Sequence, residues 1–425
     1  MDDTRSIAAP DTGSFFYGWV IVGAVFFMLL VTAGLGFYNA SVILSAAADE
    51  LNTEVGTVSF GPTLFFGISG ITGFVLSKRM ELVDIRWFYV SGGVLGAAAL
   101  AGLRFVDSVA ALYVFFALFG VGFALAGLVP STTLIARWFN KRRSVALSVG
   151  STGLSVGGIL LTPVAASYIE DHDLAAASPW MALVWFFGVV PIALLLIRSF
   201  PSDKGLQPDG APAPATVAAI PGATLSEATA TRFFQMLCIT YAMIFLAQVG
   251  GIAQLFNLAK ERTDADIAAT VLSTMALSSV IGRLVGGVVV IRLSTKLMTS
   301  ALTVVQAIAL ALIAFADTRA MLLVSAAIFG LSVGNLLMLQ PLLIAEAFGV
   351  KQYSRIYSLN QLFGTIGVAL GPFVLGLLHD WSNYETAFLF GSAANLIGLT
   401  ALFLAGSTMV PQAMWSHEAT APTPA

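Results

Sequence analysis

The sequence predicts an all-α membrane protein whose twelve transmembrane helices form two six-helix bundles. The 425 residues are 58% hydrophobic and 10% charged, with a mean hydropathy of +0.90, whereas soluble domains are about 25% charged. Twelve apolar runs approach the length of about 20 residues that a bilayer core of ~30 Å requires. A stretch rich in Pro and Ala at 200–231 separates six runs from the other six.

The expected spans lie between charged or Pro- and Gly-rich breaks. The first six are 16–44, 56–77, 87–104, 109–136, 144–169 and 179–198. The second six are 233–259, 267–291, 297–316, 320–345, 355–378 and 385–405. The first span is too long for a cleavable signal peptide, and one Arg against three Asp precedes it.

These spans predict the domain organisation. We expect an N-terminal bundle at 1–199 and a C-terminal bundle at 232–405, joined by a flexible cytoplasmic linker at 200–231. Residues 406–425 are expected to form a disordered cytoplasmic tail. With the N-terminus inside, fifteen of the 20 Lys and Arg fall on the inner side, and only Arg104, Lys260, Arg262 and Arg319 fall outside. The positive-inside rule therefore predicts that both termini are cytoplasmic.

Composition and motifs exclude several functional classes. A sequence pI of about 5.6 without a long basic run argues against a nucleic-acid binder. The single cysteine, Cys238, excludes a disulfide framework or a Cys-based metal cluster. The sequence contains no Gly-x-x-x-x-Gly-Lys-Ser/Thr motif, no metal-ligand spacing and no His-based catalytic set. We expect no enzyme activity and no cofactor.

The connection between the fourth and fifth spans combines a basic turn with small residues. Residues 141–143 (Lys-Arg-Arg) fix the topology and can contact anionic membrane lipids. Gly153 and Gly157 give the following helix a smooth face for close packing. Gly367 and Gly371 predict the same for the eleventh helix. The many Phe residues are expected to lie in the bundle cores or to face lipid.

Two motifs lie near the starts of the fifth and first spans. Residues 138–157 begin Trp-Phe-Asn-Lys-Arg-Arg and end in Gly-x-x-x-Gly. Phe15-Phe-Tyr-Gly-Trp19 opens the first span, and Ser14 precedes it where an acidic residue is usual. The chain resembles the monocarboxylate porters of the major facilitator superfamily and the related oxalate–formate exchangers. The resemblance implies the major facilitator fold and a central site reached by alternating access. It also implies a small carboxylate substrate, H⁺ as a candidate co-substrate, a monomer and a cell inner membrane.

Arg283 is the one charged residue deep inside a predicted span. Burying it costs about 2.5–3.5 kcal/mol, so its side chain should face a water-filled cavity or an anion. Its guanidinium matches a carboxylate bidentately. In the resembled families, an Arg four residues before a Gly holds the substrate carboxylate, and Gly287 has that spacing here. The alternative is an Arg283 that snorkels to the inner interface or donates to backbone carbonyls.

The coupling mechanism stays open. The resembled animal porters have an Asp four residues before this Arg, where the chain has Ser279. No Asp, Glu or His falls at mid-span, and the second-half Lys of the oxalate exchangers has no counterpart in 355–378. One buried positive charge favours a substrate with one carboxylate, by proton symport or by exchange.

Uncharged polar residues at mid-span depth complete the expected site. A polar group in lipid is expensive, so each should face the bundle interior, where interhelical hydrogen bonding is the alternative to substrate binding. The predicted substrate contacts are Tyr38, Asn39, Tyr241, Gln248, Asn335 and Asn360, with Gln340 and Gln361 as further candidates.

Two further questions remain open from the sequence. The superfamily's Asp after the second span is replaced by Ser77, and Ile291 stands in the matching second-half position; Glu81 or Asp84 can substitute for the charge.

The rival functions are an exporter of amphipathic compounds and a non-transporting membrane sensor or scaffold. The second rival needs an output domain, for which 200–231 and 406–425 are short.

Overall fold

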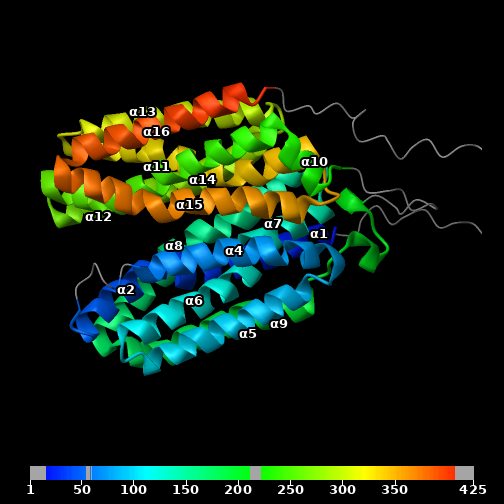
Figure 1. The fold of residues 1–425 in the computed structure, drawn as a ribbon, viewed down its shortest axis with the longest axis horizontal. Coiled ribbons are helices and arrows are strands. Elements are labelled where there is room, and N and C mark those ends of the chain that lie inside the picture. Colours follow the sequence, from blue (N-terminus) through cyan, green and yellow to red (C-terminus); the bar gives the residue numbers. More distant parts are fainter. Residues whose placement is uncertain (1–15, 54–57, 59, 211–221, 407–425) are drawn as a thin grey trace, which may run out of the picture.

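A computed structural model describes residues 16–53, 58, 60–210 and 222–406. The first bundle contains α1 (Gly18–Thr32), the π-helix η1 (Ala33–Tyr38), α2 (Asn39–Glu50), α4 (Phe60–Leu82), α5 (Arg86–Gly102), η2 (Leu103–Phe105), α6 (Val109–Ala126), α7 (Leu128–Trp138), α8 (Arg143–His172) and α9 (Leu174–Leu196). The second contains α11 (Arg232–Arg262), α12 (Ala265–Val289), α13 (Thr295–Ala314), α14 (Arg319–Phe348), α15 (Tyr353–Trp381) and α16 (Tyr384–Leu404). Figure 1 shows the two bundles as separate layers.

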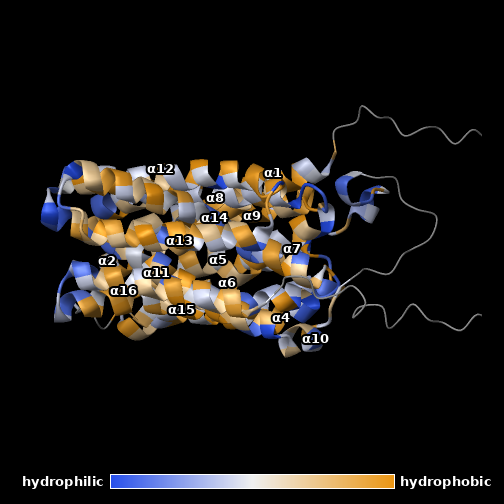
Figure 2. Cartoon of the chain, turned by 90° about the horizontal axis from the view of Figure 1, so that it is seen from above, coloured by the Kyte–Doolittle hydropathy of each residue, from blue (hydrophilic) through white to orange (hydrophobic). Residues whose placement is uncertain are grey.

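The described residues contain twelve helical spans that are long and apolar enough to cross a membrane. Large apolar side chains such as Phe187, Leu195 and Phe373 are more than 60% exposed, which suits lipid rather than water. In Figure 2, hydrophobic residues dominate the middle of the helices, and hydrophilic residues gather at their two ends. The predicted fold class is confirmed, and the chain is a multi-pass membrane protein.

The observed helices extend beyond several predicted spans. The first span reaches Glu50 instead of 44, and the second runs to Leu82 instead of 77. An apolar run marks the part of a helix that lies in the hydrocarbon, whereas the helix itself continues beyond the hydrocarbon as long as its backbone hydrogen bonds are satisfied. The sixth span starts at Leu174 instead of 179 because Asp173 caps it by accepting the amide of Ala176 at 2.7 Å.

Glycines bring pairs of helices into backbone contact in each bundle. A Cβ added at Gly153 or Gly157 of α8 would collide with a carbonyl oxygen of α1. A Cβ added at Gly367 or Gly371 of α15 would collide with a carbonyl oxygen of α11. These contacts agree with the packing role predicted for both glycine faces, and they join α1 to α8 and α11 to α15.

The two bundles meet at the end of the molecule where residues 200–210 and 222–231 lie, which we call the linker end. There α8 packs against α12, and α4 packs against α15. Gly287 leaves no room for a Cβ beside Ser148, and a Cβ at Gly70 would lie 3.0 Å from Leu362. In Figure 1 the bundles are closest near the linker end and diverge toward the opposite end.

The predicted linker is more structured than its composition indicates. Its described parts form η3 (Pro201–Lys204), η4 (Pro208–Gly210) and α10 (Leu225–Ala230). The carboxylate of Asp209 accepts the backbone amides of residues 140–142 at 2.8–3.3 Å. On the other bundle, Ala223 N donates to Phe348 O at 2.8 Å, and Leu225 N donates to the side-chain oxygen of Gln352. Residues 407–425 of the tail predicted at 406–425, and residues 211–221 of the predicted linker, lie outside the described residues.

Candidate functional site

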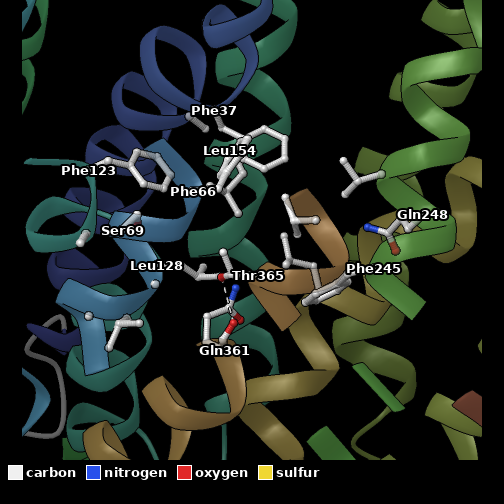
Figure 3. A pocket seen from close by; sticks show the side chains of 18 of the residues that line it. Phe37, Phe66, Ser69, Phe123, Leu128, Leu154, Phe245, Gln248, Gln361 and Thr365 are labelled. Carbon is white, nitrogen blue, oxygen red and sulfur yellow. Dashed lines mark hydrogen bonds between the residues drawn. The ribbon is translucent and has the colours of Figure 1, made fainter. Parts of the chain in front are cut away.

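A central cavity of about 130 Å³ lies between the bundles and takes its lining from both. Its lining is mainly apolar and aromatic, as Figure 3 shows for the residues that it labels. The aromatic hydrocarbon rings are Phe37, Phe66, Phe123 and Phe245. The polar or charged side chains are Tyr38, Ser69, Gln248, Arg283, Ser358, Gln361 and Thr365.

Arg283 lines this cavity, six residues before the end of α12, or about 9 Å along the axis. Its side chain is 2% exposed and lies between the bundles rather than at the outer surface. Nε donates to Gly334 O of α14 at 2.7 Å, and Nη1 donates to Ser151 O of α8. Ser148 Oγ in turn donates to Arg283 O at 2.5 Å. Arg283 therefore lines a cavity, as the first interpretation expects of its position, and also donates to backbone carbonyls, as the alternative expects.

The charge of Arg283 has no acidic partner among the described residues. Within that same set, Nη2 donates no hydrogen bond. Backbone carbonyls bear partial charges and offset only part of the cost of burying a guanidinium. The cavity thus contains a cation whose compensation is incomplete.

Tyr38 and Gln248 also line the cavity. The Tyr38 ring rests on Gly158 of α8, where an added Cβ would come within 2.7 Å of the ring, and Tyr38 interacts electrostatically with Arg283. The Oε1 atom of Gln248 is buried and accepts no hydrogen bond from a described residue. Two polar groups thus accompany the cation.

The other four predicted contacts lie outside the cavity lining. Asn39 donates to Met181 Sδ at 3.3 Å, and Asn335 donates to Leu331 O at 2.8 Å. Asn360 pairs with Gln340 and Cys238, and Tyr241 packs against Phe245 with ring centroids 5.5 Å apart. The structure places these four residues away from this cavity, and their contact with substrate stays a prediction. Mid-span polarity separates interior from lipid but does not separate a cavity from a helix interface.

Sequence reasoning missed part of the lining. Ser69, Ser358 and Thr365 carry no signal, since small hydroxyl side chains are common in packed membrane helices. The four cavity Phe residues belong to a set of 31, and nothing in the sequence distinguishes them. Gln361, a further candidate, does line the cavity, and Figure 3 shows it on α15 beside Thr365.

The structure separates the two candidate carboxylates at the linker end. Asp84 accepts hydrogen bonds from Arg86 at 2.5 and 2.8 Å and from Ser199 at 2.5 Å, so it is bound within the first bundle. Burial raises the pKa of Asp84, but these hydrogen bonds outweigh it and lower the pKa. Glu81 instead interacts with Arg355 of the second bundle and with Arg137. Of the two carboxylates, Glu81 is the one near a basic residue of the second bundle, and its Oε1 accepts no hydrogen bond from a described residue.

Curated proteins similar to this chain are transporters. Monocarboxylate transporter 13 of Rattus norvegicus is 26% identical over 395 residues, which cover 92% of this chain and 88% of that protein. Monocarboxylate transporter 11 of Mus musculus is 24% identical over 93% of this chain and 88% of its own. The aspyridones efflux protein of Emericella nidulans is 22% identical over 92% of this chain and 77% of its own.

Solved structures share the fold. The E. coli fucose:proton symporter FucP aligns with a TM-score of 0.70 at 16% identity, covering 92% of this chain and 100% of that chain. The human organic anion transporter MFSD10 aligns with a TM-score of 0.64 at 14% identity, covering 91% and 99%. The family model described as Major Facilitator Superfamily matches residues 26–261 and 236–422. With its two six-helix bundles around a central cavity, the chain belongs to the major facilitator superfamily and is a transporter of that superfamily.

Proposed function

We propose that the chain is a secondary carrier of monocarboxylates in which Arg283 binds the substrate carboxylate. The observation that carries the proposal is a buried guanidinium on a central cavity with no acidic partner among the described residues. One buried cation neutralises one carboxylate, so a monoanion forms a neutral complex that crosses hydrocarbon at lower cost than either ion alone. The names of the mammalian relatives point to the same substrate class.

The carboxylate would engage Nη2, which donates to no described residue, and compete for Nη1. Nη1 now donates to the Ser151 carbonyl, a neutral acceptor. A carboxylate carries a full negative charge where the carbonyl carries a partial one, so its attraction to the guanidinium is stronger and it displaces this carbonyl favourably. Tyr38 and Gln248 lie on the same cavity and complete the polar part of the site.

This exchange of partners supplies a link between binding and movement. The bond from Arg283 to Ser151 joins α12 to α8, and therefore one bundle to the other. Substrate that takes Nη1 removes that bond and weakens the contact at the linker end. Alternating access would follow as the bundles rock about the cavity. In this proposal the linker end is cytoplasmic, the membrane is a bacterial-type inner membrane, and the carrier acts as a monomer.

Coupling is proposed as proton symport, with exchange of organic anions as the alternative. The lining holds no Asp, Glu or His among the described residues, so a transported proton would travel on the substrate or through another part of the chain. Uptake into proteoliposomes with and without an inward proton gradient distinguishes the two. Acceleration by the gradient supports symport, and a requirement for internal anion supports exchange.

The test of the site is saturable uptake of a radiolabelled carboxylate by purified, reconstituted protein. Arg283→Gln should reduce uptake about 30-fold or more, since removing one partner of a buried charge pair costs 2–5 kcal/mol. Arg283→Lys keeps the charge but loses the planar fork of donors, so its uptake should lie between that of the wild type and that of Arg283→Gln. Arg292→Gln, at an exposed Arg just beyond the same helix, is the matched control and should transport normally. Normal uptake by a folded Arg283→Gln protein contradicts the proposal.

A second candidate function is export of amphipathic compounds. The aromatic lining favours it, and the fungal efflux relative shares most of the chain. An exporter of this kind would bind neutral or cationic aromatic compounds as well as their carboxylate analogues, and Arg283→Gln would not abolish that binding.

A further inference from the structure

Aromatic rings from both bundles surround the cavity that contains Arg283. Phe37 of η1, Phe66 of α4 and Phe123 of α6 come from the first bundle, and Phe245 of α11 comes from the second. Figure 3 shows the first three gathered on one side of the cavity and Phe245 on the other. Their ring faces and edges are the surfaces on which another aromatic ring packs favourably.

These rings are held in place by glycines and by one another. A Cβ at Gly36 would lie 3.0 Å from the Phe123 ring, and a Cβ at Gly364 would lie 2.9 Å from the Phe245 ring. Phe37 and Phe66 pack edge to face with centroids 5.3 Å apart. The apolar surface is therefore pre-organised, which reduces the ordering cost of binding.

The cavity has the size of one aromatic ring. Its volume is about 130 Å³, and a protein cavity of about 150 Å³ lined by apolar side chains holds one benzene molecule. A two- or three-carbon acid would leave most of the Phe surface without a partner.

Resting on the proposed function, we propose that the preferred substrate is a monocarboxylate carrying a single aromatic ring. Its carboxylate binds Arg283, and its ring packs between Phe245 and the rings of Phe37, Phe66 and Phe123. These Phe residues determine specificity, because they pack favourably against the substrate's aromatic ring and do not interact with its carboxylate. Burying one phenyl group should favour such a substrate over acetate by about tenfold to a hundredfold.

Three probes separate this inference from the proposed function: acetate, phenylacetate and phenylacetamide. Binding to the purified protein is measured by isothermal titration calorimetry, and transport by proteoliposome uptake. We expect phenylacetate to bind at least about tenfold more tightly than acetate, and phenylacetamide to bind far more weakly than phenylacetate. Equal binding of acetate and phenylacetate overturns the ring specificity while the carboxylate carrier stands. Equal binding of phenylacetamide and phenylacetate overturns the role of the carboxylate, and no binding of any probe overturns both.

Variants then assign the specificity to the rings. Phe245→Ala should reduce the preference for phenylacetate over acetate about fivefold to tenfold, with acetate affinity little changed. Phe187→Ala, whose ring is 61% exposed on the outer surface, is the matched control and should keep the preference. Phe66→Leu serves if Phe245→Ala does not fold, and thermal unfolding of each variant monitors folding. An unchanged preference in both folded cavity variants overturns the inference.

Discussion

Replacing Ser148 with alanine removes a hydrogen bond that joins the two bundles. Ser148 Oγ of α8 donates to the backbone oxygen of Arg283 in α12 at 2.5 Å, and both atoms are buried. A neutral hydrogen bond contributes about 1 kcal/mol net. If the bond forms only while the linker end is closed, Ser148→Ala shifts the equilibrium between closed and open forms about fivefold toward opening.

The assay measures the distance between the bundles by pulsed electron paramagnetic resonance. Spin labels are attached at Lys78→Cys in the first bundle and Arg292→Cys in the second, both exposed at the linker end. Because Cys238 is the single cysteine, one Cys238→Ser substitution gives a clean background. The fraction of protein at the longer label distance should rise with Ser148→Ala.

Ser392→Ala is the matched control for this experiment. Ser392 Oγ donates to Ala307 O at 2.8 Å, which is the same kind of bond but lies within the second bundle. It should lower the free energy of unfolding by a similar amount and leave the distance distribution unchanged. The reasoning is refuted if Ser148→Ala leaves the distribution unchanged, or if Ser392→Ala shifts it equally.

Two more predictions concern stability. Gly157→Ala places a methyl group against the backbone oxygen of Leu30, and the overpacking should lower the free energy of unfolding by ~1–3 kcal/mol. Gly23→Ala is the control and should be neutral, because an added Cβ at Gly23 meets nothing within 4 Å. Equal melting temperatures of the two variants in detergent would contradict the close α1–α8 contact. Because hydrogen bonds depress the pKa of Asp84 in the folded protein, its stabilisation is full above the ordinary value of 3.8 and is lost as pH falls through the lower folded value. Asp84→Asn should therefore be less stable than wild type at pH 7, and the difference should shrink below about pH 4; a difference independent of pH would refute it.

Hydrophobic patterning predicted the helices, because a membrane span has one dominant requirement. A run of apolar residues must match the hydrocarbon thickness, and all twelve runs became helices. The ends were predicted less well. Glu50 and Leu82 lie beyond the apolar runs, where backbone hydrogen bonding rather than hydropathy decides where the helix stops.

The site was predicted where one physical reason dominates. A guanidinium in hydrocarbon needs an aqueous or anionic environment, so Arg283 was placed at a cavity, and the structure has it there. A side-chain amide can be satisfied without a cavity, by hydrogen bonding to another helix: Asn360 accepts a hydrogen bond from Gln340 at 2.8 Å in a helix interface. Gln361, one residue further, faces the cavity. Which of Asn360 and Gln361 faces the cavity depends on how whole helices pack, and a single sequence does not reveal that packing.

The attachment of both ends of the interdomain segment sets a mechanical limit on the carrier. Asp209 holds the turn at 140–142, and residues 223 and 225 hold the turn at 348–352, so each bundle keeps its own end of the peptide. From residue 210 to residue 222 there are twelve backbone steps, whose full extension is about 40 Å. The two turns can separate up to that distance with neither attachment broken, and beyond it one of them must detach.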